Sequence, residues 1–449
     1  MSINQLNAAP SQPYSKLSGD SLYKKITWRF VPLLFLCYAV AYLDRVNIGF
    51  AKLQMLTDLG FSDAVYAFGA SIFFVGYVAF EIPSNIVLHK IGARIWISRI
   101  MITWGIVSAA IAFVDPIAAW TGLGKETTFY ILRFLLGVSE AGFFAGIVLY
   151  ISYWFPAERQ AKVMAGFIVA IPISLIVGGP ISGALMDHFH DVHGLAGWQW
   201  MLVLEGLPAV ILGTVVFMYL DSSVVDAKWL TDGEKKTINN NLQIDDRHKR
   251  HNFSAVIGDY RVWVMAGIMV CYSTGIYGLS FWLPTIIKNA GVKSAFDIGL
   301  LSAIPWLVSA IAMILNAAHS RKMNERRWHA AIPSFIAGFS FILAALTANN
   351  LPVALFFLSV SAGGVMAHAP VFWTFPASVL SGTAAAAGIA LITSIGSTSG
   401  FVGSYAASLA KDLTGDINNG TYVLAALMLL GGVLVLVIPK QTLSSRLEK

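Results

Sequence analysis

Four ionisable residues interrupt long apolar stretches of this 449-residue sequence. Asp44 and Arg45 stand together late in one stretch, and Arg133 and Glu140 lie within another. A charge deep in an apolar medium costs at least ~2.5–3.5 kcal/mol on membrane-insertion scales, so such residues face a polar site or pair with one another. The four residues therefore predict a buried site that handles charge.

The spacing of these residues assigns them different partners. Neighbours on a helix point about 100° apart, so Asp44 and Arg45 cannot both face one group. Arg133 and Glu140 share a helix face but are separated by two turns, about 10.5 Å. A guanidinium stays charged and binds carboxylates through a planar fork, whereas a buried glutamate can become neutral. We therefore expect the arginines to bind an anion and Glu140 to bind a proton.

The composition indicates a membrane protein. The chain is 57% hydrophobic and 12% charged, whereas a soluble chain carries about 25% charged residues. The two cysteines, Cys37 and Cys271, lie in apolar runs, where packing is their expected role. The spacing of His188, His190 and His193 is unlike that of a tight metal site. We expect no metal, no cofactor and no enzymatic activity, since no nucleophile or phosphate-binding motif is present.

Hydropathy divides the chain into twelve apolar runs, each long enough to span a bilayer as a helix. Their expected limits are 30–50, 64–88, 95–114, 128–152, 161–186, 198–220, 261–287, 297–318, 329–347, 351–376, 383–410 and 421–439. A hydrophilic segment separates the runs six and six, as in transporters built from two repeats. The expected organisation is a tail (1–29), a six-helix bundle (30–220), a linker (221–260), a second six-helix bundle (261–439) and a tail (440–449).

The net charge of +6 is distributed unevenly over the loops. Most of the 30 Lys and Arg residues fall on one side of the twelve-span arrangement. The other side holds only Lys52, Lys125, Lys288, Lys293 and Lys411. Cytoplasmic loops carry such an excess, which places both termini and the linker in the cytoplasm. The basic charge is thus explained by membrane orientation, and no nucleic-acid partner is expected.

Other polar and aromatic residues inside the spans are secondary candidates. Glu205 is expected to form an ion pair between helices. His368 is a possible proton or substrate site, although hydrogen bonding within the bundle is the more common role of such a residue. Glu81 precedes Pro83 and is expected in a gate or a structural contact. Four aromatic residues lie deep enough to contact a substrate: Tyr77, Tyr272, Tyr277 and Trp373.

Several ordered motifs resemble the anion:cation symporter family of the major facilitator superfamily, whose bacterial members move sugar acids, tartrate or aromatic acids. The resemblance covers nearly the whole chain. Its motifs are Leu43 to Ala51, Glu81 to Asn85, Leu132 to Phe143, Tyr153 to Pro156, Phe281 to Pro284, Glu325 to His329 and Ala384 to Ala390. It implies a major facilitator fold in a bacterial inner membrane, working as a monomer that couples substrate to protons.

The resemblance also implies roles for individual residues. Arg45 and Arg133 would contact the anion, Glu140 would be the coupling proton site, and Asp44 a second one. Tyr77 would donate a hydrogen bond to the substrate.

In one respect the chain departs from the family. Relatives often carry amides in the fifth and eleventh spans, where this chain has hydroxyls such as Thr393 and Ser397. The anion therefore stays open between a sugar acid, a tartrate-like acid and an aromatic acid. Proton-independent exchange or facilitation is an alternative function, and a membrane sensor is a more remote one.

Overall fold

The computed structural model describes residues 19–246, 257–379, 383–403, 405, 414 and 418–440. These residues are almost entirely helical, and they contain no strand beyond an isolated bridge between Val192 and Leu195. Eleven helical segments among them are long and apolar enough to cross a membrane. The expected all-α membrane fold is confirmed. Of the expected span 383–410, only part lies within the described residues, as do only parts of the two tails.

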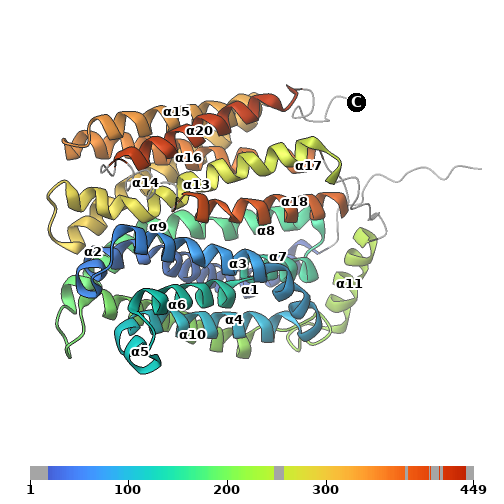
Figure 1. Ribbon diagram of the computed structural model, residues 1–449. Helices are drawn as coiled ribbons and strands as arrows, with labels where there is room; N and C mark the ends of the chain where they lie inside the picture. The colour runs from blue at the N-terminus through green and yellow to red at the C-terminus, as the bar shows by residue number, and fades with distance from the viewer. Residues whose placement is uncertain are drawn as a thin grey trace, which may run out of the picture.

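The first half of the chain contributes ten helices to the membrane-spanning body. They are α1 (Asp20–Val46), α2 (Ile48–Leu59), α3 (Asp63–Ile91), α4 (Ala93–Ile111), α5 (Val114–Thr121), α6 (Lys125–Glu140), α7 (Phe143–Trp154), α8 (Ala157–Ile168), α9 (Ala170–His188) and α10 (Gly197–Tyr219). The pairs α1–α2, α6–α7 and α8–α9 each form one span in two pieces. The short helix α5 lies at one end of the molecule (Figure 1).

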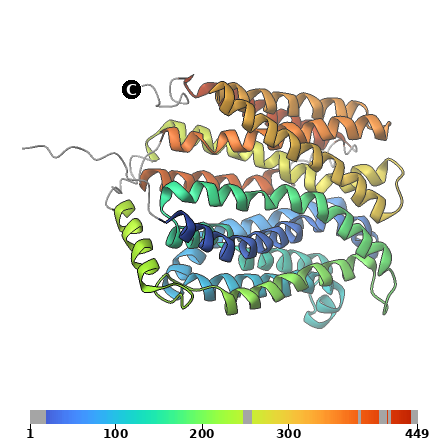
Figure 2. The same cartoon turned by 180° about the vertical axis from the view of Figure 1, so that it is seen from behind.

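The second half packs beside the first. It contains α13 (Tyr260–Asn289), α14 (Ala295–Met323), α15 (Arg327–Leu346), α16 (Leu351–Phe372), α17 (Phe375–Val379), α18 (Thr383–Ser397) and α20 (Asn418–Val437). The helices of both halves run roughly side by side (Figures 1 and 2). The linker helix α11 (Asp232–Asp246) lies at the opposite end of the molecule from α5.

The fourth span is broken directly after Glu140. Ala141 is extended and Gly142 has φ 83°, a left-handed conformation that glycine adopts without steric cost. The Ser84 hydroxyl of α3 donates a hydrogen bond of 2.6 Å to the freed Ala141 carbonyl. A Cβ on Gly142 would lie 2.4 Å from that hydroxyl oxygen. The break therefore depends on glycine, and it places Glu140 at a helix end inside the protein.

Small residues let the two halves approach closely where α9 crosses α14. A Cβ on Gly299 would lie 2.1 Å from the Gly179 carbonyl oxygen, and one on Gly179 would lie 2.8 Å from the Gly299 carbonyl oxygen. Such backbone contact is the usual role of small residues between membrane helices. Any larger side chain at either position would separate the halves.

Next to this crossing, a carboxylate of the first half caps a helix of the second. Asp187 of α9 accepts hydrogen bonds from the Ser294 hydroxyl (2.8 Å) and from the backbone N–H groups of Ala295 (3.2 Å) and Phe296 (2.8 Å). These groups form the N-terminus of α14, where a negative charge is stabilised by the helix dipole and by free N–H donors. The contact closes the two halves together at the end of the molecule that carries α5.

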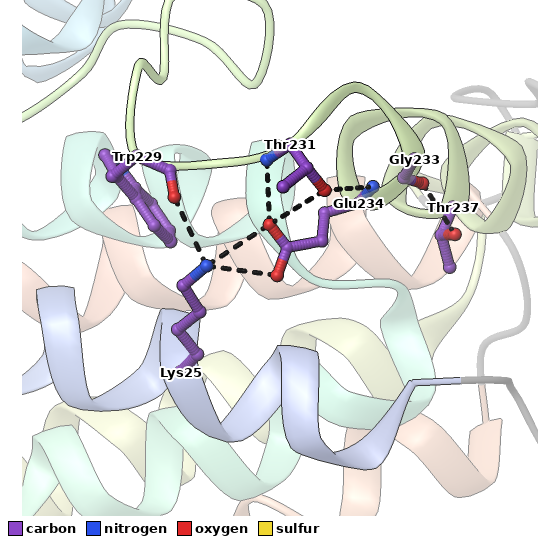
Figure 3. Close-up of polar contacts among 6 residues, drawn as sticks. All are labelled: Lys25, Trp229, Thr231, Gly233, Glu234 and Thr237. Carbon is purple, nitrogen blue, oxygen red and sulfur yellow. Dashed lines mark hydrogen bonds and ion pairs between the residues drawn. The ribbon is translucent and has the colours of Figure 1, made fainter.

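The linker helix is fastened to α1 at the other end. Thr231 and Glu234 form a capping box, in which the Thr231 N–H donates to Glu234 (2.8 Å) and the Glu234 N–H donates to the Thr231 hydroxyl (3.3 Å). The Lys25 ammonium donates to both Glu234 carboxylate oxygens, at 3.0 and 3.2 Å, and to the Trp229 carbonyl (Figure 3). One carboxylate thus starts α11 and ties it to the first half.

This geometry gives the linker a pH dependence. The Thr231 backbone N–H and the Lys25 ammonium hold the pKa of Glu234 below its usual value. A depressed pKa stabilises docking above the unfolded-state pKa, and that stabilisation is lost as pH falls through the folded-state pKa. We expect Glu234→Gln to speed α11 amide hydrogen exchange near pH 7, relative to wild type. The difference should shrink as pH falls below the ordinary glutamate pKa of about 4.3 and vanish once the lowered folded-state pKa of Glu234 is passed, because both proteins are then neutral at this position. A pH-independent difference would contradict the assignment to the Glu234 charge.

The Asp187 cap generates a second prediction. Asp187→Ala removes three acceptor contacts, and loss of a helix cap costs about 0.5–2 kcal/mol, or roughly 2- to 30-fold in the population of the closed arrangement. We expect spin labels at the exposed positions Trp120 and Asn349 to report a larger share of long distances at the α5 end. Both native cysteines are buried and should not react with the label.

The control for this experiment is Asp297→Ala. Asp297 is an exposed carboxylate in the first turn of the same helix. Its removal should leave the distance distribution close to that of the unsubstituted protein, and an equal effect of the two substitutions would refute the cross-half cap.

Candidate functional site

Arg45 contacts a carboxylate of its own half and a hydroxyl of the second half. Its Nη2 forms an ion pair with Glu140 Oε1, and its Nη1 donates a hydrogen bond of 3.1 Å to the Tyr277 hydroxyl of α13. The Arg45 side chain is 12% exposed and that of Glu140 is 1% exposed. The sequence places Glu140 on one helix face with Arg133, seven residues away. In the structure Glu140 pairs instead with Arg45, which belongs to a different helix.

Aromatic rings surround the Arg45 guanidinium. The ring centres of Tyr77, Phe73 and Tyr42 lie 5.1, 5.7 and 5.8 Å from its central carbon. A cation over an aromatic face is stabilised by about 0.5–2 kcal/mol, more when it is desolvated. Tyr77, predicted as a substrate hydrogen-bond donor, thus contacts Arg45 with its ring. The rings hold the guanidinium in place without consuming its N–H donors.

Arg133 occupies a more enclosed position than Arg45. It is 1% exposed, and its Nε and Nη2 donate to the backbone carbonyls of Gly69 (3.1 Å) and Ala70 (3.5 Å). Its guanidinium lies 5.0 Å from the centre of the Phe73 ring, which Arg45 also contacts. The two arginines therefore share one aromatic neighbour, while the hydrogen bonds of Arg133 go to α3. In this conformation only Arg45 makes the ion pair.

Asp44 points away from its neighbour Arg45, as the helical angle requires. It accepts hydrogen bonds from the Ser108 hydroxyl of α4 (2.5 Å) and from the Asn47 amide (3.2 Å). Asp44 Oδ2 has no hydrogen-bond partner among the described residues. Serine in an apolar run is common, so no sequence signal identified Ser108 as a contact of Asp44.

Three further candidates belong to the second half. Tyr272 packs its ring 5.5 Å from that of His368. His368 Nδ1 lies 3.0 Å from the Ala330 carbonyl and 3.2 Å from the Ser334 hydroxyl, so it hydrogen-bonds within the bundle. Trp373 packs in a separate apolar cluster beside Phe372. The structure therefore brings Tyr277, but none of these three, into contact with Arg45.

Two hydroxyls of α18 donate hydrogen bonds to carbonyls of their own helix. Thr393 donates to the Ile389 carbonyl (2.9 Å) and Ser397 donates to the Thr393 carbonyl (3.0 Å). Ser394 instead reaches across to α3, where its hydroxyl lies 3.4 Å from Glu81 Oε2. On α18, Ser394 is thus the residue whose hydroxyl bonds to the first half. Glu81, predicted in a gate or a structural contact, lies at that crossing.

Glu205 corrects one expectation. Its Oε1 accepts a hydrogen bond from the Ser182 hydroxyl (2.7 Å), and no ion pair to it is found among the described residues. Polar packing takes the place of the expected charge pair, because α9 presents a serine to Glu205. No group of three or more His, Cys, Asp or Glu residues that could hold a metal occurs in the described part of the chain.

Known transport proteins resemble this chain over most of its length. The chain is 42% identical over 422 residues to NicT of Pseudomonas putida, which is named for metabolite transport, covering 93% of this chain and 94% of that protein. It is 46% identical over 424 residues to an Agrobacterium vitis protein named for tartrate transport, covering 93% and 91%. A solved structure of the xylose transporter XylE from E. coli shares the fold, with TM-score 0.72 at 13% identity over 93% of this chain and 98% of that one.

Two packed helical halves of membrane-spanning length, together with the similarity to named transport proteins, define a membrane transporter rather than an enzyme. The profile of the Major Facilitator Superfamily matches residues 34–404, and the chain belongs to that superfamily.

The contact between Arg45 and Tyr277 can be tested by removing one hydroxyl. Tyr277→Phe keeps the ring but deletes a hydrogen bond to a charged group, worth about 1.5–3 kcal/mol. We expect a lower apparent melting temperature for the purified variant. Tyr272→Phe is the matched control, since it removes a hydroxyl from the same helix and retains the ring beside His368. Equal melting temperatures for the two variants would show that the Arg45 contact contributes nothing.

Proposed function

We propose that this protein is a proton-coupled symporter that imports an organic carboxylate by alternating access. The observation that carries the proposal is the Arg45–Glu140 ion pair, positioned where Tyr277 of the second half meets α1 of the first. A guanidinium held by an ionisable acid offers one cation to two competing anions, the glutamate and a substrate carboxylate.

The competition supplies the coupling. While Glu140 is ionised it occupies Arg45 Nη2, and its negative charge repels an incoming carboxylate. A proton on Glu140 removes that charge and frees the guanidinium fork for the substrate. Arg133 and the Asp44 carboxyl add charge close by, so the site stays near neutrality when anion and proton enter together. Binding of one then favours binding of the other.

The direction of transport follows from the distribution of basic residues. The cytoplasmic assignment of the linker places α11 inside and α5 outside. The Asp187 cap and the α9–α14 crossing then close the periplasmic side. In the proposed cycle, the substrate leaves this arrangement towards the cytoplasm, where a higher pH removes the Glu140 proton. The ionised Glu140 then forms its ion pair with Arg45 again, and the substrate carboxylate is released.

The substrate class rests on the chemistry of the site and on the named relatives. One accessible arginine and the Tyr277 hydroxyl suit a carboxylate that also bears a hydroxyl. A relative of 46% identity is named for tartrate transport. We therefore place tartrate-like hydroxy acids first and sugar acids second. The rings of Tyr42, Phe73 and Tyr77 would also accommodate an aromatic acid.

Glu140→Gln tests the coupling in proteoliposomes. Glutamine mimics the protonated acid, so Arg45 stays free while no proton can be gained or lost. We expect accumulation of tartrate driven by an inward proton gradient to fall at least about tenfold, a loss corresponding to ~1.4 kcal/mol. Exchange of internal for external tartrate should persist, because it needs no net proton movement.

The control is Glu126→Gln, on the first turn of the same helix and away from Arg45. It should accumulate tartrate like the wild type. Full gradient-driven accumulation by Glu140→Gln would refute proton coupling at this residue. Accumulation without proton co-flux in the wild type would favour the anion exchanger or facilitator. Competition by sugar acids and aromatic acids in the same assay ranks the substrate classes.

A further inference from the structure

A further buried acid lies near Asp44, outside the Arg45–Glu140 ion pair. Glu205 of α10 is 3% exposed, and the Ser182 hydroxyl that donates to its Oε1 is 2% exposed. Glu205 Oε2 has no partner at normal hydrogen-bond distance among the described residues. The Asn47 amide interacts with Glu205 and also donates to Asp44. Ser182, Glu205, Asn47 and Asp44 are thus neighbours in one polar cluster.

Among the described residues, no cation pairs with Glu205. Among the helices packed against α10, α1 contributes Asp44, a like charge, and α9 contributes only the Ser182 hydroxyl. Arg94 of α4 bonds to the Phe217 carbonyl, and Asp58 of α2 bonds to Trp198, near opposite ends of α10. An ionised carboxylate in this position would be buried, unpaired and next to another acid, which is the costliest state for such a group.

The charges of the cluster balance without Glu205. Arg45 and Arg133 supply two positive charges, and Asp44 and Glu140 supply two negative ones, so the cluster is neutral when both acids are ionised. A third carboxylate would leave a net negative charge that opposes the arrival of an anion. A protonated Glu205 adds no negative charge to the cluster, and its carboxyl group can still form hydrogen bonds.

We propose that Glu205 stays protonated throughout the transport cycle and acts as a positioning residue. Through Asn47 it holds the Asp44 carboxyl and the junction of α1 and α2, two residues from Arg45. One face of this helix end, with Asp44 and Asn47, is then held by Glu205. The other face directs Arg45 towards Glu140. The protonation state of Glu205 is independent of the proposed symport. The positioning role rests on the proposed function, because it is measured by transport.

Infrared difference spectroscopy tests the protonation state without transport. The carbonyl stretch of a protonated carboxyl should be present in the wild type and missing in Glu205→Gln at every pH from about 5 to 7, a range in which an ordinary glutamate is ionised. Disappearance of this band within that range, or its absence from the wild type, would overturn the proposal. The result is the same whether or not the protein proves to be a proton symporter.

Transport then tests the positioning role. Glu205→Gln keeps a neutral hydrogen-bonding side chain, so we expect tartrate uptake and its pH profile close to those of the wild type. Glu205→Leu leaves Asn47 without this partner and should reduce uptake about 5- to 150-fold, with a shifted pH profile that reflects a displaced Asp44. Ser182→Ala is a milder variant that should shift the profile in the same direction if Glu205→Leu does not fold.

Two outcomes would overturn the positioning role. An unshifted pH profile in both Glu205→Leu and Ser182→Ala would show that Glu205 does not act on Asp44. Loss of gradient-driven uptake in Glu205→Gln would show that the residue must ionise. A wild type whose uptake ignores the proton gradient would instead refute the proposed symport, while the infrared result would stand.

Discussion

Burial of charge is the constraint on which the organisation of this protein depends. A lone ion in a low-dielectric interior is so unfavourable that it neutralises, pairs or reaches water. Arg45 cannot neutralise, because a guanidinium stays charged, so Glu140 must compensate for it. The remaining contacts of the cluster serve the same requirement, with aromatic faces around Arg45, backbone carbonyls at Arg133 and hydroxyl or amide donors at Asp44.

The helix breaks follow from this requirement. Glu140 is the last residue of α6, and Arg45 lies two residues before the junction of α1 and α2. A continuous helix fixes each side chain relative to its neighbours, whereas an interrupted one can change the direction of the chain at the charged residue. Gly142 and the Ser84 hydroxyl satisfy the geometry and the hydrogen bonding of one break. Discontinuous membrane helices at substrate and ion sites are a recurring solution to this problem.

Sequence reasoning reached the helices and the charged residues because both depend on local properties. Apolar runs predict spans wherever they are long enough, and the cost of a buried charge marks Asp44, Arg45, Arg133 and Glu140 whatever the fold. Partner choice depends on how distant helices pack, so the sequence could not distinguish Tyr277 from Tyr272, and it predicted an ion pair for Glu205 where the structure has a serine. One signal was available but unused: Thr231 and Glu234 have the spacing of a capping box.

The contacts between the halves must also be balanced for the molecule to work. The capping of α14 by Asp187 of α9, the Gly179–Gly299 crossing and the Arg45–Tyr277 bond all favour the arrangement closed at the α5 end. A stabilisation of about 5.5 kcal/mol is enough to shift a two-state equilibrium from 1:99 to 99:1. Without compensation, these contacts would therefore leave the protein almost entirely in this one arrangement. The opposite arrangement must therefore gain contacts of similar strength near α11. Because Arg45 takes part both in the closing contact and in the Glu140 ion pair, a proton or an anion at this residue changes the balance directly. Proton or anion binding at the central site and closure of the α5 end are then linked through the Arg45 side chain.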